Sequence, residues 1–144
     1  MSRILALDVG DKRIGVALTD PLKIIASPHC SIDRDKESAY LKILKLAQEH
    51  QCELIIVGMP IELSGKAGEQ AKKTKNFIKK LNKTLKENCH NCEIKQWDER
   101  FSSVEAERSL IGSKLLNKDR ANARDRASAS LILQSYLESI KRET

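Results

Sequence analysis

The chain has 144 residues, the size of one domain, and we expect a single domain over residues 1–144. Its 26 Lys and Arg against 20 Asp and Glu give a net charge of +6, which suits a nucleic-acid or phosphate ligand without requiring one. Since no apolar run could span a bilayer and the N-terminus lacks the pattern of a signal peptide, we expect a cytoplasmic protein with no membrane contact.

The N-terminal third predicts a run of strands followed by a helix. Residues 3–9 form a short apolar run that a Gly-Asp turn closes, and residues 13–19 alternate well enough to pair with it as a hairpin. Residues 23–32 can add a third antiparallel strand, in which Pro28 indicates an edge or a break. Apolar residues at helical spacing then predict a helix over residues 37–50.

The middle of the chain predicts two further strands around a long helix. Residues 53–57, ELIIV, are continuously apolar, which is typical of a strand covered on both faces. Apolar positions from Ala71 to Leu85 mark a helix whose outer face is rich in lysine. Residues 93–97 read as the last strand, which Asp98-Glu99-Arg100 closes.

The C-terminal part predicts two helices separated by a loop. A capping box, with Ser102 as the N-cap and Glu105 three residues later, begins a helix that ends near Leu116. Residues 117–124 are polar and charged and predict a loop, and residues 127–140 share one apolar helical face. This order of elements predicts an α/β fold, with a mixed sheet and helices on its faces. In such sheets, functional groups gather beyond the carboxyl ends of the parallel strands.

Four acidic residues stand at such positions. Asp8 ends the first strand, Asp98 and Glu99 end the last strand, and Asp125 lies near the predicted start of the final helix. If the first and last strands are near neighbours, Asp8 and Glu99 meet at one edge, and a helix laid across that edge could add Asp125. Adjacent residues of an extended strand face opposite ways, so Asp98 and Glu99 cannot share one site; we favour Glu99 for its reach and keep Asp98 as a second candidate.

A group of carboxylates predicts a site for Mg²⁺ or Mn²⁺, because clustered negative charges repel and a divalent cation relieves that repulsion. Two such ions can activate water and stabilise the leaving oxygen of a phosphodiester. The alternative interpretation is structural, because acids are also favoured at turns and at helix starts.

The four cysteines, Cys30, Cys52, Cys89 and Cys92, predict no disulfide framework in a cytoplasmic chain. Cys89 and Cys92 form a CxxC pair, but a zinc site normally needs a second pair of ligands at suitable spacing. We therefore interpret them as loop cysteines without a metal or redox role.

Four stretches of the sequence resemble one known family, the YqgF/RuvX family of Holliday junction resolvase-like proteins. They occur in the family's order and spacing and together span nearly the whole chain. The stretches are ALDVGDKRIGVALTD (6–20), IIVGMPIELSGKAGEQA (55–71), DERFSSVEAERSL (98–110) and DRASASLILQSYL (125–137).

The resemblance implies an RNase H-like fold with a five-stranded mixed sheet flanked by helices. It also implies a carboxylate metal site for one or two Mg²⁺ or Mn²⁺ ions, in which Asp8, Glu99 and Asp125 are the matching residues. The family usually has Ala-Ala after the last acid, where this chain has Ser128-Ala129; serine is small enough for close helix packing to survive.

Basic residues beside these acids have two interpretations. Lys12 and Arg13 follow Asp8 in the hairpin turn, where they could bind substrate phosphates or only solubilise the turn. Arg100 could bind phosphate or pair with Asp98 or Glu99 and orient it. The lysine-rich helix is either a solvated face or a surface for a nucleic-acid backbone.

The resemblance implies a nuclease that processes the 5′ end of precursor 16S rRNA, with structured RNA and a ribosomal particle as candidate partners. An alternative within the family is resolution of branched DNA at a Holliday junction, which needs two active sites and hence a dimer. A monomer or a weak homodimer is expected. Two further alternatives are a non-catalytic RNA-binding assembly factor and an actin-like ATPase, for which the chain is too short.

Overall fold

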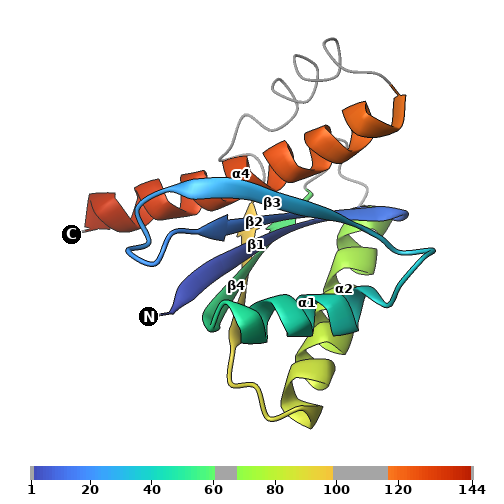
Figure 1. Ribbon diagram of the computed structural model, residues 1–144, viewed down its shortest axis with the longest axis horizontal. Helices are drawn as coiled ribbons and strands as arrows, with labels where there is room; N and C mark the ends of the chain where they lie inside the picture. Colours follow the sequence, from blue (N-terminus) through green and yellow to red (C-terminus); the bar gives the residue numbers. More distant parts are fainter. Residues whose placement is uncertain (1, 61–67, 99–116, 144) are drawn as a thin grey trace.

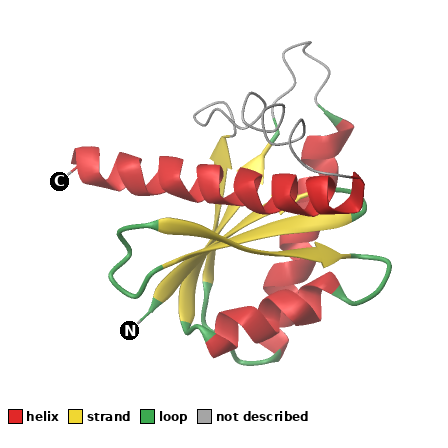
Figure 2. Ribbon diagram, turned by 45° about the horizontal axis from the view of Figure 1, so that its top comes forward, coloured by secondary structure: helices red, strands yellow, loops and turns green. Residues whose placement is uncertain are grey.

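The structure, a computed structural model, describes residues 2–60, 68–98 and 117–143. Within these ranges three helices enclose one sheet: α4 covers one face, and α1 and α2 cover the other (Figures 1 and 2). The strands are β1 (Arg3–Val9), β2 (Arg13–Thr19), β3 (Ala26–Asp33), β4 (Cys52–Met59) and β5 (Glu93–Asp98), and the helices are α1 (Ala39–Glu49), α2 (Glu69–Glu87) and α4 (Asn117–Glu143).

The sheet has five strands in the order β3-β2-β1-β4-β5. The meander β1-β2-β3 is antiparallel, whereas β4 and β5 run parallel to β1. The five-stranded mixed sheet flanked by helices is therefore confirmed. Because β1, β4 and β5 run the same way, their carboxyl ends meet at one edge of the sheet.

Strand β1 is buried on both faces and divides its side chains between two cores. Leu5 and Leu7 belong to the core under α1 and α2, and Ile4 and Ala6 belong to the core under α4. Side chains alternate along a strand, so Asp8 falls on the same face as Ile4 and Ala6, under α4. This placement brings the only acid of β1 toward the C-terminal helix.

Helix α4 lies very close to the sheet because small residues form the contact. Ala6, Ala17 and Ala129 are completely buried between the helix and the sheet. At Gly15 a Cβ atom would overlap the backbone carbonyl of Asp125, so this position of β2 has room only for glycine. Ser128, where the family has alanine, is also buried, and its hydroxyl donates a 2.8 Å hydrogen bond to the carbonyl of Arg124 within the helix.

One predicted boundary is wrong. Residues 117–124, expected as a loop, form the first turns of α4, which begins at Asn117. The segment is polar, but it contains neither glycine nor proline and is rich in Ala, Arg and Lys, which are good helix formers. Asp125 therefore lies about two turns inside the helix instead of opening it. The helix expected over residues 102–116 lies outside the described residues.

No helix in the described part of the chain is long and apolar enough to cross a membrane.

Substituting Gly15→Ala should destabilise the fold, because the added methyl group forces β2 and α4 apart. Overpacking of this kind costs about 3 kcal/mol at the upper end of its usual range. Urea denaturation followed by circular dichroism measures the change. Leu41→Ala, at an exposed position of α1, is the control and should change stability by less than about 0.5 kcal/mol. Equal stability of Gly15→Ala and the unmodified protein would contradict the close packing.

Candidate active site

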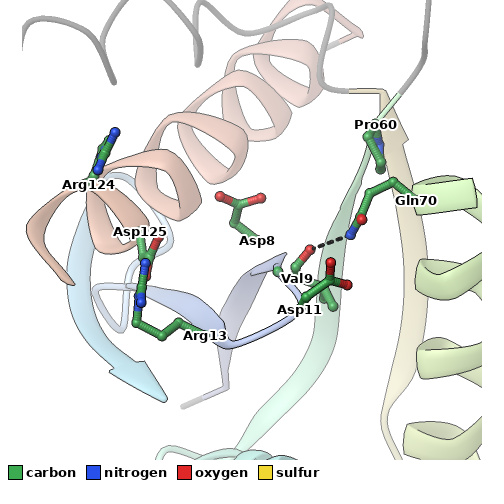
Figure 3. Close-up of a pocket in the computed structure, with 9 residues that line it drawn as sticks. Asp8, Val9, Asp11, Arg13, Pro60, Gln70, Arg124 and Asp125 are labelled. Atoms are coloured by element: carbon green, nitrogen blue, oxygen red, sulfur yellow. Dashed lines mark hydrogen bonds and ion pairs between the residues drawn. The ribbon is translucent and has the colours of Figure 1, made fainter. Parts of the chain in front are cut away.

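A cavity of about 420 Å³ opens where β1 ends, between α4 and the start of α2 (Figure 3). We call it the β1–α4 cavity. Two of the predicted carboxylates, Asp8 from β1 and Asp125 from α4, line it together. The described residues around it are Asp8, Val9, Gly10, Asp11, Arg13, Pro60, Gln70, Arg124 and Asp125. Asp8 and Asp125, far apart in sequence, thus line one cavity.

Two donors from the sheet fix the carboxylate of Asp125. Arg13 Nε donates to Asp125 Oδ2 at 2.9 Å, and the Ser31 hydroxyl donates to the same oxygen at 3.2 Å. Both donors are explained by strand pairing: Gly15 pairs with Ser31 across β2 and β3, and Arg13 lies two residues before Gly15 on the same face. The glycine that admits the helix is therefore surrounded by the side chains that hold Asp125.

Asp8 faces the same space from the floor of the cavity. Its carboxylate points toward α4 in Figure 3, on the side of the cavity where Asp125 lies. The opposite wall is anchored by α2, where Gln70 Nε2 donates to the carbonyl of Val9 at 3.3 Å. This bond ties the first turn of α2 to the end of the strand that carries Asp8.

The cavity carries both signs of charge. Asp8, Asp11 and Asp125 supply carboxylates, and Arg13 and Arg124 supply guanidinium groups. A wall of this kind can offer oxygen ligands to a cation and donors to a phosphate within one small volume. The side chains of Arg13 and Asp125 are 37% and 24% exposed, so their ion pair remains accessible to a ligand.

Two other predicted residues, Asp98 and Lys12, do not line the β1–α4 cavity. Asp98 is the last residue of β5, where Ile94 packs against the core under α1 and α2, and Trp97 packs against the core under α4. By alternation Asp98 faces the α1 and α2 side, away from Asp8. Lys12 is exposed and does not line the β1–α4 cavity. Glu99 and Arg100 lie outside the described residues.

The oxygen donors present are those that a hard divalent cation prefers. Asp8 and Asp125 provide two carboxylates, and in the described ranges no group of three His, Cys, Asp or Glu residues is close enough to hold a metal. The two described carboxylates are therefore of the donor type that Mg²⁺ or Mn²⁺ prefers.

Three residues at the cavity were not predicted from the sequence: Ser31, Gln70 and Arg124. Ser31 reaches Asp125 only through the register of β2 and β3, which no local pattern reveals. Arg124 was assigned to a loop, and Gln70 lies in one of the family-like stretches but had no assigned role. The one local signal for Gln70 was its position two residues after Gly68, the residue that precedes helix α2.

Solved structures define the class to which this arrangement belongs. The fold matches Thermus thermophilus RuvC in complex with a Holliday junction substrate, with a TM-score of 0.66, 11% identity and coverage of 100% of this chain and 98% of that one. It also matches Ydc2, the yeast mitochondrial Holliday junction resolvase, with a TM-score of 0.54, 13% identity and coverage of 94% and 78%. At such identities the likeness establishes the fold, which is the RuvC type of the RNase H-like fold.

The sequence places the chain more narrowly within that class. A family model described as "RuvX: Holliday junction resolvase" matches residues 2–139. A relative from Halothermothrix orenii named "Putative pre-16S rRNA nuclease" is 43% identical over 136 residues, covering 94% of both chains. A relative with the same name from Fusobacterium nucleatum is 42% identical over 142 residues, covering 96% of this chain and 98% of its own. The chain belongs to the RuvX family.

The cysteines lie away from the β1–α4 cavity. All four are free, and Cys89 and Cys92 line a separate cavity beside the C-terminal end of α2. Burial raises the pKa of the Cys52 thiol to about 12 and that of the Cys92 thiol to about 11. Both thiols therefore stay protonated at neutral pH, which disfavours metal binding and redox chemistry because these require the thiolate.

Thiol labelling should separate the cysteines by reactivity. At pH 8, iodoacetamide should modify the exposed Cys89 first, because Cys52 and Cys92 are almost entirely protonated well below pKa values of about 12 and 11. Reactivity of Cys92 should rise only as the pH approaches 11. Mass spectrometry of the digested protein measures the order, and added zinc should leave it unchanged. Protection of Cys89 and Cys92 by zinc would contradict the absence of a metal role.

Proposed function

We propose that the chain is a metal-dependent nuclease that hydrolyses phosphodiester bonds and processes the 5′ end of precursor 16S rRNA. The observation that carries the proposal is the meeting of Asp8 and Asp125 in one cavity at the carboxyl ends of the parallel strands. Membership of the RuvX family and the names of relatives that align over nearly their whole length support the reaction and the substrate.

In this proposal Asp8, Glu99 and Asp125 hold one or two Mg²⁺ or Mn²⁺ ions. When bound, such ions activate a water molecule and stabilise the leaving oxygen of the phosphodiester. The alternation of β5 favours Glu99 over Asp98 as the third ligand, because Asp98 faces the other side of the sheet from Asp8. In this proposal Asp98 has a structural role at the end of β5.

The chain's own residues divide the remaining work. Arg13 and Ser31 both donate to Asp125 Oδ2, which holds this carboxylate in one orientation before substrate arrives. Arg13 also presents its guanidinium to the cavity, where it can contact a substrate phosphate beside the cleavage point. Lys12 and Arg100 are proposed to contact substrate phosphates further from the cleavage point. Preorganised charge of this kind is effective because it needs no rearrangement during the reaction.

A second candidate function is Holliday junction resolution, which the description of the matching family favours. The same carboxylates would cleave DNA, but paired cuts across a four-way junction require two active sites and therefore two copies of the chain. Purified protein should be incubated with precursor 16S rRNA and with a four-way DNA junction, each with and without Mn²⁺. Cleavage of the RNA alone by a monomer decides for rRNA processing, and symmetric cuts in the junction by a dimer decide for resolution.

Replacing either described carboxylate should abolish cleavage while the fold persists. Loss of a residue that merely supports a metal ligand lowers activity about 10- to 100-fold, so we expect at least about a 100-fold loss in Asp8→Asn and in Asp125→Asn. Glu138→Gln, which removes one exposed negative charge from the same helix as Asp125, is the matched control and should cleave normally.

Circular dichroism should show that all three variants are folded. Full activity in both aspartate variants would overturn the site. Metal-independent RNA binding by the unmodified protein with no cleavage of either substrate would favour a non-catalytic assembly factor instead.

A further inference from the structure

A second cavity, of about 440 Å³, lies along α2 on the other side of the first strand's end. We call it the α2 groove. Its walls come from α2, from the start of α1 and from the segment that joins β3 to α1. The described residues around it are Val9, Asp11, Arg34, Asp35, Tyr40, Gln70, Lys73, Asn76, Phe77 and Lys80.

The α2 groove adjoins the β1–α4 cavity. Val9, Asp11 and Gln70 line both. The Gln70 side chain donates a hydrogen bond to the Val9 carbonyl, which joins two of these shared residues (Figure 3). A chain molecule held in the β1–α4 cavity can therefore extend past the shared residues into the α2 groove.

Three cationic side chains face the α2 groove: Arg34, Lys73 and Lys80. Lys73 and Lys80 lie seven residues apart on one helix, so they are about 10 Å apart along its axis and can reach different phosphates of one strand. Such a row of cations matches a row of phosphates that follows the helix.

Arg34 is already held in place at the groove. Its Nη1 donates to the carbonyl of Gly10 at 2.8 Å, and its guanidinium lies 5.3 Å from the centre of the Phe77 ring, which in turn stacks on Tyr40. A guanidinium fixed by a carbonyl on one side and a ring on the other has lost much of its freedom before binding. Its remaining N–H groups can donate hydrogen bonds to a phosphate at little entropic cost.

We propose that the α2 groove binds the sugar–phosphate backbone of the nucleic acid whose scissile phosphate occupies the β1–α4 cavity. This rests on the proposed function and extends it by a strand path from β1 along α2. Arg34, Lys73 and Lys80 contact successive parts of the backbone. The contacts are to phosphate and carry no sequence information, so the groove sets affinity and register rather than base specificity.

Two acids, Asp11 and Asp35, line the α2 groove, and Asp11 limits how tightly the strand is held. Asp11 lines both hollows and its Oδ1 lies 3.4 Å from Lys73 Nζ, in a pair whose two side chains are about 60% exposed. A pair this exposed is weak, and a phosphate can replace Asp11 as the partner of Lys73. Asp11 therefore opposes strand binding. Its removal should raise the affinity for nucleic acid, whereas removal of a groove lysine should lower it.

The test compares two double variants of equal charge. Lys73→Gln with Lys80→Gln removes the groove lysines, and Lys72→Gln with Lys79→Gln removes lysines of the same helix and spacing that do not line the groove. Binding of a fluorescein-labelled fragment of precursor 16S rRNA, and of a labelled four-way DNA junction, is measured by anisotropy in EDTA over a range of salt concentrations.

For the groove variant we expect binding about 10-fold weaker on the preferred probe. The slope of log affinity against log salt should also fall by about 1.5, as for two lost phosphate contacts. The control variant should lose less than about 3-fold, and Asp11→Asn should bind more tightly than the unmodified protein. Equal losses in the two double variants, or no binding of either probe by the unmodified protein, would overturn the proposal.

Cleavage assays on the same proteins keep the two proposals separate. Normal metal-dependent cleavage, with binding that is the same in both double variants, means that the groove proposal is wrong and the nuclease proposal stands. If the unmodified protein cleaves neither substrate but only the groove variant loses binding, the groove proposal stands and the nuclease proposal is wrong.

Discussion

The close contact between α4 and β2 at Gly15 is the constraint on which the site depends. Without a side chain there, the backbone of Asp125 comes against the sheet and its carboxylate falls between Arg13 and Ser31. The same contact lays the helix over the face of β1 that carries Asp8. Asp8 is placed by its own strand, but Asp125 meets it only through this contact, so the site forms only when the helix has docked. Anything that lifts α4 from the sheet separates the two carboxylates.

The alternation of side chains across the sheet explains which parts of this arrangement the sequence could predict. Strands β1 and β2 were predicted with their observed ends, because both are apolar runs bounded by clear turns, and Asp8 could be placed at a strand end for the same reason. The start of α4 was missed because a polar segment gives no periodic signal, although its composition permits a helix. The part played by Ser31 depends on register between strands, which is a tertiary property and has no local signature.

The sheet also separates two electrostatic environments. On the α4 side, carboxylates meet guanidinium groups in a nearly balanced cavity, which suits a cation and the phosphate being cleaved. On the α2 side, lysines dominate an exposed helix whose buried stripe consists of Thr74, Phe77, Leu81 and Leu85. Among the described residues the positive charge is therefore not spread evenly, and the lysines of α2 lie beside the cavity carboxylates rather than among them. Long-range attraction of a polyanion by α2 can act without the lysines neutralising the carboxylates of the β1–α4 cavity.

The ion pair between Arg13 and Asp125 reduces the repulsion between the cavity carboxylates and still leaves Asp125 accessible to a ligand. Two carboxylates facing one small volume repel each other, and this repulsion weakens the packing of α4 on the sheet. The Arg13 guanidinium offsets it at Asp125, but both side chains are partly exposed, so the pair contributes no more than about 1 kcal/mol. A stronger, fully buried pair would hold Asp125 against any competing cation, since breaking it would leave an uncompensated charge. A weak pair, aided by one hydroxyl, orients the carboxylate and would still release it to the divalent ion of the proposed site.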